Sequence, residues 1–174
     1  MTDITLILGG ARSGKSRHGE GLIEKLAPPW AYIATAQALD AEMTTRIAEH
    51  QSRRGRNWST IEAPLELTQA LLDVEQSSRP VLVDCLTLWL SNLMGAGKDI
   101  AEETDALTAT LAATTVPVII ISNEVGQGIV PDNALARQFR DQAGWLNQTI
   151  AGVADNVTFV AAGLPLSLKS SANE

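Results

Sequence analysis

Eight residues near the N-terminus have the types and the spacing needed to hold the phosphates of a nucleotide. The run Gly9-Gly10-Ala11-Arg12-Ser13-Gly14-Lys15-Ser16 matches the pattern G-x-x-x-x-G-K-[ST] in full. The glycines let main-chain N–H groups turn inward around phosphate oxygens, and a helix that begins here adds a favourable dipole. Lys15 is expected to reach the β- and γ-phosphate oxygens, and the Ser16 hydroxyl to take a place on Mg²⁺. The sequence therefore predicts a P-loop that binds a nucleoside triphosphate.

A carboxylate from another strand is expected to complete this site, because a P-loop shares its metal ion with an acid at a strand end. Asp84 follows the apolar run Val81-Leu82-Val83, so Ser16 and Asp84 are the predicted metal ligands. An ordinary acid that caps the next helix is the alternative interpretation. Both interpretations place Asp84 at the carboxyl edge of the sheet, where ligands bind.

A histidine lies among arginines in the segment 39–54, which has helical periodicity. His50 shares one sector of the predicted helix with the apolar residues Leu39, Met43 and Ile47. Arg46 lies beside this sector, and Arg53 and Arg54 flank it one turn further on. A packed core histidine is one interpretation. The other is a nucleophile, since neighbouring cations help to keep an imidazole neutral and could bind the phosphates that it attacks.

Short apolar runs alternate with helical segments along the whole chain. The predicted strands are residues 4–8, 31–35, 81–85, 116–122 and 157–161. The predicted helices are residues 13–26, 39–54, 65–74 and 99–113, with a last helix that begins near Asp132. Most of the apolar runs are continuous, as in strands covered on both faces. We therefore expect one α/β domain over residues 1–174, with a mostly parallel central sheet flanked by helices and a frayed tail from residue 170.

Composition excludes several classes of partner. The net charge is −7 and the pI is about 4.8, which argues against a basic face for nucleic acid and favours a small ligand in a local pocket. The chain has no apolar stretch near the roughly 18 residues of a membrane span and no basic leader before the P-loop. A single cysteine, Cys85, excludes an internal disulfide. We expect a cytoplasmic protein with no nucleic-acid partner and no membrane span.

Further motifs carry a resemblance to one enzyme family. The P-loop is followed by Tyr32-Ile33-Ala34-Thr35-Ala36, by Arg46-Ile47-x-x-His50 and by Trp58-x-Thr60-x-Glu62. A later block reads Ser122-Asn123-Glu124-Val125-Gly126-x-Gly128-Ile129-Val130-Pro131. From about residue 4 to residue 169, the chain resembles the bifunctional adenosylcobinamide kinase/adenosylcobinamide-phosphate guanylyltransferases of cobalamin biosynthesis.

The resemblance implies a RecA-like P-loop NTPase fold, a homotrimer and two reactions. ATP or GTP phosphorylates the hydroxyl of adenosylcobinamide. GTP then gives GMP to a histidine with release of pyrophosphate, and adenosylcobinamide phosphate accepts the GMP to form adenosyl-GDP-cobinamide. The guanylylated histidine of the family corresponds to His50, which makes His50 the expected catalytic residue.

The resemblance also implies a set of nucleotide-binding residues. They are Gly9 to Ser16 of the P-loop, Thr35, Ala36, Gln37, Gln51, Ser52, Arg53, Arg54, Glu62 and Asp84. Family members often have Arg-Pro shortly after the histidine, where this chain has Arg54-Gly55. Another four polar residues, Asn123, Glu124, Arg137 and Arg140, fit substrate or interface contacts and equally fit helix caps and ion pairs between subunits.

Two other function classes are compatible with the P-loop alone. One is a monofunctional small-molecule kinase in which His50 is merely packed. The other is a regulatory ATPase that changes partners rather than making a product. The absence of a basic patch and of a second domain in the sequence argues against the regulatory ATPase.

Overall fold

Seven strands form one sheet in the computed structural model, which describes residues 3–37 and 54–171. The strands are β1 (Ile4–Gly9), β2 (Trp30–Ala34), β3 (Trp58–Glu62), β4 (Val81–Asp84), β5 (Val118–Asn123), β6 (Asn156–Ala161) and β7 (Leu164–Lys169). Their order is β3-β2-β4-β5-β1-β6-β7, and every pair is parallel except β6 with β7. The predicted α/β fold with a mostly parallel sheet is confirmed.

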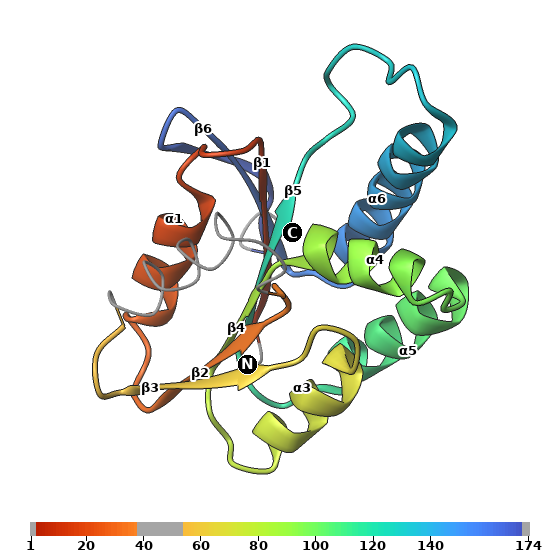
Figure 1. Ribbon diagram of the computed structural model, residues 1–174. Coiled ribbons are helices and arrows are strands. Elements are labelled where there is room, and N and C mark those ends of the chain that lie inside the picture. The colour runs from red at the N-terminus through yellow and green to blue at the C-terminus, as the bar shows by residue number, and fades with distance from the viewer. Residues whose placement is uncertain (1–2, 38–53, 172–174) are drawn as a thin grey trace.

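Helices lie on both faces of the sheet (Figure 1). On one face lies α1 (Lys15–Ile23), and on the other lie α3 (Leu67–Glu75), α4 (Leu86–Gly95), α5 (Ile100–Ala113) and α6 (Ala134–Val153). Because successive strand residues point to opposite faces, each strand contributes to two cores. Leu6 and Ile33 pack with the four-helix side, whereas Ile7 and Tyr32 pack with Ile23 of α1.

Three elements were not predicted from the sequence. The helix α4 is buried at five positions, so it lacks the polar face that makes a helical period visible. The strands β3 and β7 are exposed or half-buried along most of their length, so neither has a continuous apolar run. Pro165 is tolerated in β7 because this strand lies at the edge of the sheet.

The observed start of one helix agrees with the start predicted from the sequence, and the observed start of another differs from it. Asp99 caps α5, since its side chain accepts hydrogen bonds from the N–H groups of Ala101 and Glu102. The predicted start of the last helix near Asp132 is one residue early, because Asn133 Oδ1 accepts from the N–H of Ala136 at 2.8 Å. A short polar side chain in the residue just before a helix can accept a hydrogen bond from the main-chain N–H three positions further on.

The predicted helix 39–54 lies outside the described residues, apart from Arg54, which is not helical. Within residues 3–37 and 54–171, no helix combines the length and the apolar character needed to cross a bilayer.

Candidate nucleotide-binding site

The eight P-loop residues connect β1 to α1 at the carboxyl end of β1, as the motif predicts. A Cβ atom on Gly9 would lie 2.3 Å from the carbonyl oxygen of Val160, so no side chain fits there. Gly14 precedes α1 with a φ of 100°, a conformation that glycine adopts without strain. Arg12 also has a positive φ, of 55°, at the exposed tip beside Ala11. Alternating backbone conformations of this kind turn N–H groups toward a bound anion.

Two polar groups of the P-loop, on Lys15 and Ser13, are buried. Lys15 is buried, and its Nζ donates to the carbonyl oxygen of Gly10 at 2.6 Å. The Ser13 hydroxyl is buried and has no hydrogen-bond partner among the residues that the structure describes. Because buried hydroxyls are nearly always hydrogen-bonded, this oxygen is suited to a ligand phosphate. The N–H of Gly163, in the turn between β6 and β7, donates to the carbonyl oxygen of Ser13 at 2.8 Å and supports the loop from the side.

The predicted metal ligands lie together. Ser16 Oγ donates to Asp84 Oδ2 at 3.3 Å, and the hydroxyl of Tyr32 donates to the same oxygen at 2.8 Å. Magnesium takes oxygen ligands and is usually bound by one or two carboxylates together with substrate phosphates and waters. The described part of the chain has no cluster of three or more His, Cys, Asp and Glu residues that could hold a metal by itself. The pair of Ser16 and Asp84 fits a magnesium ion that a nucleotide shares.

Arg54 is linked to this carboxylate through Tyr32. The guanidinium carbon of Arg54 lies 3.5 Å from the centroid of the Tyr32 ring. Burial, followed by the nearby Asp84 carboxylate, raises the pKa of Tyr32, so its hydroxyl stays protonated and remains a donor to Asp84. The stack therefore holds one predicted nucleotide-binding residue beside the predicted metal ligands. The other residues predicted from that segment, His50, Gln51, Ser52 and Arg53, lie outside the described residues.

Thr35 follows β2, and its side chain makes hydrogen bonds to the main chain inside the protein. Its Oγ1 donates to the carbonyl oxygen of Cys85 and accepts from the N–H of Cys85, both at 2.8 Å. The carbonyl oxygen of Thr35 accepts from Asn92 Nδ2 of α4 at 2.8 Å. The threonine thus anchors the loop after β4, and the half-buried Ala36 and Gln37 continue along the same edge.

Glu62 lies at the same edge but further out. It ends β3, where it pairs with Ala34 of β2, and its side chain is exposed. Two strands, β2 and β4, separate β3 from β5. The structure therefore brings Ser16, Asp84 and Arg54 together around Tyr32, and leaves Glu62 at the rim.

A second hydrogen-bonded group lies at the end of β5. Asn123 Nδ2 donates to Thr87 Oγ1 at 2.8 Å, and the carbonyl oxygen of Asn123 accepts from Asn147 Nδ2 at 3.2 Å. Ser122 Oγ donates to Asn147 Oδ1 at 2.7 Å. Neither Thr87 nor Asn147 was assigned a role from the sequence. The available signal was that Asn147 is a polar residue among the apolar positions of the last predicted helix.

Cys85 provides a test of how closed this edge of the sheet is. The thiol is buried, and burial together with the Asp84 carboxylate raises the pKa of Cys85 to about 11. Because the thiolate is the reactive species, the thiol is expected to be inert near neutral pH in the folded protein. A thiol reagent that reports by absorbance should react slowly with the native protein and fully after denaturation. Fast reaction of the native protein would show that this edge opens.

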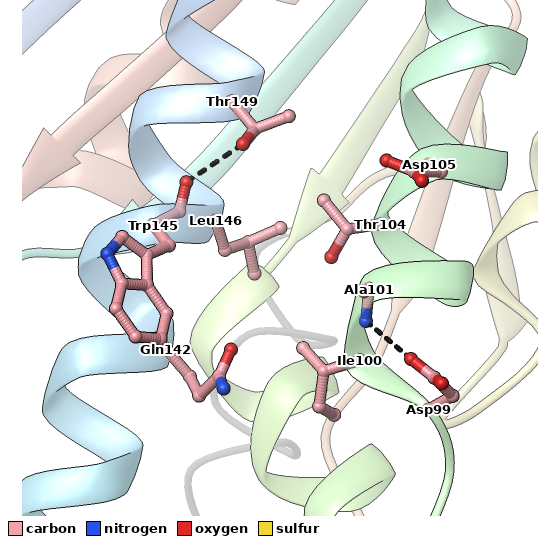
Figure 2. Close-up of a pocket in the computed structure, with 9 residues that line it drawn as sticks. All are labelled: Asp99, Ile100, Ala101, Thr104, Asp105, Gln142, Trp145, Leu146 and Thr149. Carbon is pink, nitrogen blue, oxygen red and sulfur yellow. Dashed lines mark hydrogen bonds between the residues drawn. The ribbon is translucent and has the colours of Figure 1, made fainter.

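A separate cavity of about 450 Å³ lies between α5 and α6. Figure 2 shows its lining, with the Trp145 ring on α6 across from Thr104 on α5. The lining residues are Asp99, Ile100, Ala101, Thr104, Asp105, Gln142, Trp145, Leu146 and Thr149. Two carboxylates and no lysine or arginine line this cavity, so it does not suit a phosphate.

A parallel sheet with a P-loop after one strand and an acid after another defines the class of P-loop NTPases. The family model described as "Cobinamide kinase / cobinamide phosphate guanyltransferase" matches residues 5–168. The chain belongs to this family of cobalamin biosynthesis enzymes, as the sequence motifs predicted.

Two relatives agree with this assignment. The chain is 49% identical to the bifunctional adenosylcobalamin biosynthesis protein CobP of Pseudomonas aeruginosa, over 94% of this chain and 96% of the relative. It is 40% identical to the protein CobU of Salmonella typhimurium, over 94% and 98% of the two chains.

Two solved structures show the fold alone. The P4 protein from bacteriophage phi6 in complex with ADP has a TM-score of 0.52 at 18% identity, over 94% of this chain and 52% of that chain. The VirB11 ATPase of the Brucella suis type IV secretion system has a TM-score of 0.50 at 12% identity, over 96% and 47%. Both support the P-loop NTPase fold that was predicted.

Proposed function

We propose that the two reactions of the family use the P-loop site and His50 in turn. ATP or GTP at the P-loop phosphorylates the hydroxyl of adenosylcobinamide, and GTP then supplies GMP to adenosylcobinamide phosphate through His50. The observation that carries this proposal is the hydrogen bond from Ser16 to Asp84, next to the buried Lys15. This arrangement has the donors and the acid that a transferred phosphoryl group requires.

In the phosphorylation step, the protein mainly positions charged and polar groups around the phosphates. Lys15 and the N–H groups of residues 9–16 hold the phosphate oxygens, and the buried Ser13 hydroxyl supplies a further donor. Ser16 and Asp84 hold Mg²⁺, which when bound neutralises negative charge on the phosphates. Tyr32 holds the Asp84 carboxylate in place through its hydrogen bond of 2.8 Å.

In the transfer step, a nitrogen of His50 attacks the α-phosphorus of GTP. The bond from the α-phosphorus to the bridging oxygen breaks and pyrophosphate leaves. An oxygen of adenosylcobinamide phosphate then attacks the same phosphorus and frees the histidine, so one displacement is divided into two. Gln51, Ser52, Arg53 and Arg54 contact the nucleotide beside it. Ala36 and Gln37 border its pocket, Glu62 lies at the rim, and Thr35 supports this edge from inside the protein.

The Arg54 contact supports this role for His50. Arg54 stacks on Tyr32, which is bonded to Asp84. His50 precedes Arg54 by only four positions in the sequence, so we infer that it acts on a nucleotide held at the same site. One nucleotide pocket could therefore serve both reactions.

Product analysis tests the two reactions separately. The protein is incubated with adenosylcobinamide and Mg²⁺, first with ATP alone and then with GTP added, and the corrinoids are separated by chromatography. We expect adenosylcobinamide phosphate in the first incubation, and adenosyl-GDP-cobinamide with an equal amount of pyrophosphate in the second. A reaction that stops at the phosphate in the presence of GTP would favour the monofunctional kinase with a packed His50.

The proposed assembly is a homotrimer in the cytoplasm, and the edge strand β7 supports the assembly. Leu164, Leu166 and Leu168 lie on one face of β7 and are 72%, 61% and 57% exposed. An exposed apolar row on an edge strand favours pairing with another chain.

Leu166→Glu is expected to dissociate the trimer, because it places a charge in the middle of this row. Sedimentation of the wild-type protein should give the mass of three chains, and the variant should give the mass of one. Thr149→Glu, at an exposed position of α6, is the control and should leave the mass unchanged. A wild-type monomer would contradict the proposed assembly, and a trimeric Leu166→Glu variant would place the subunit contact elsewhere.

A further inference from the structure

An acid lies next to the P-loop at the end of β5. Glu124 is the first residue after β5, and β5 lies between β1, which enters the P-loop, and β4, which ends at Asp84. Asn123 is the register partner of Gly9, and the N–H of Glu124 donates to the carbonyl oxygen of Gly9 at 3.0 Å. Since neighbouring strands lie about 4.8 Å apart, the main chain of Glu124 lies beside the start of the phosphate-binding loop.

The carboxylate of Glu124 is held in place by its own loop. Its Oε1 accepts from the N–H of Gly126 at 2.7 Å, and the side chain is half-buried. Within residues 3–37 and 54–171, no hydrogen bond engages the second carboxylate oxygen. A carboxylate fixed through one oxygen keeps the lone pairs of the other oxygen for a proton that a ligand brings.

The other acids near this edge have different surroundings. Asp84 accepts from Ser16 and Tyr32 and is the proposed metal ligand. Glu62 lies at the end of β3, with β2 and β4 between it and β5. Glu20 belongs to α1 and lies near Tyr32, where its charge contributes to the raised pKa of that tyrosine. Among the described residues, Glu124 is therefore the acid beside the P-loop that the metal site does not use.

We propose that Glu124 is the catalytic base of the phosphorylation step. The hydroxyl oxygen of adenosylcobinamide attacks the γ-phosphorus of the bound triphosphate, and the bond from that phosphorus to the bridging oxygen breaks. The nucleoside diphosphate leaves, and the hydroxyl proton passes to the carboxylate of Glu124. The transfer of GMP needs no such base, because the attacking phosphate of the second acceptor is already ionised near neutral pH. This inference rests on the phosphorylation step of the proposed function.

Glu124→Gln tests the role with little change of shape, since the amide oxygen can still accept from the N–H of Gly126. The kcat of phosphorylation is expected to fall by about 100-fold or more, the usual contribution of a positioned base. Transfer of GMP to adenosylcobinamide phosphate added from outside should change by less than about threefold, within ordinary experimental variation. The acid limb of the wild-type pH profile for phosphorylation should disappear in the variant.

Asp132→Asn is the matched control, because Asp132 is an exposed acid of the same connection between β5 and α6. This variant should keep both activities. Phosphorylation by Glu124→Gln at a rate near that of the wild type would overturn the proposal. An equal loss of both activities would also overturn it, since it would show that Glu124 only shapes the loop. A wild-type protein that does not transfer GMP would instead contradict the proposed function. The role of Glu124 would then still be decided by comparing phosphorylation by the wild type with phosphorylation by Glu124→Gln.

Discussion

Lys15→Met is expected to lower the kcat of adenosylcobinamide phosphorylation by about 1,000-fold, the upper range for loss of one preorganised donor to a transition-state oxygen. Lys15 is 7% exposed, and its ammonium group lies inside the loop at 2.6 Å from the carbonyl oxygen of Gly10. Methionine keeps a stem of similar length and removes only the charge and its hydrogen bonds. The rate is measured by transfer of labelled γ-phosphate to the corrinoid at saturating nucleotide.

Arg17→Met is the matched control for this variant, because Arg17 is an exposed cation two residues further along α1. It should phosphorylate at close to the wild-type rate. Thermal unfolding of Lys15→Met should occur at or above the wild-type temperature, since a buried ammonium group costs desolvation free energy. A Lys15→Met protein that is folded and phosphorylates at the wild-type rate would show that the P-loop does not carry this reaction.

His50→Ala is expected to lower the rate of GMP transfer by about 10,000-fold or more, the scale on which loss of a nucleophile acts in covalent catalysis. Phosphorylation should continue, because the groups proposed for it lie in the P-loop and at the ends of β4 and β5, outside the sequence segment that contains His50. Adenosylcobinamide phosphate should therefore accumulate in the presence of GTP. Chromatography of the corrinoids over time measures both rates in one experiment.

His18→Ala is the control, because the chain contains two histidines. Burial, followed by the charge of Lys25, lowers the pKa of His18 on α1, and no function was assigned to it from the sequence. Both activities should survive its removal. Formation of adenosyl-GDP-cobinamide by His50→Ala at the wild-type rate would mean that the nucleophile lies elsewhere and that His50 is a packed residue.

Much of the fold could be predicted because buried parallel strands are continuous apolar runs. All five predicted strands are present, with ends displaced by a few residues at most. The elements that were not predicted from the sequence were missed for different physical reasons. The helix α4 is apolar on too many sides to show a period, and β7 is recognisable only through its pairing with β6, which a local pattern does not contain.

The site could be predicted in part. The P-loop is a local motif, and Asp84 follows from the rule that ligands bind at strand ends, so both are visible in the sequence. The partners of the side chains are not visible there. Thr35 was expected at the nucleotide, but its hydroxyl binds both main-chain groups of Cys85, fifty residues away. The stack of Arg54 on Tyr32 likewise depends on a pairing of distant residues that only the folded chain shows.

The most direct test of the account is a search for GMP bound covalently to the protein. The wild-type protein is incubated with Mg²⁺ and GTP labelled at the α-phosphate, then denatured and examined for protein-bound label. We expect label that is labile to acid and stable to base, as a phosphorus–nitrogen bond requires, and that is absent from His50→Ala. Label that remains on His50→Ala would contradict the assignment of this residue. A wild-type protein without label would contradict the two-step transfer of GMP itself.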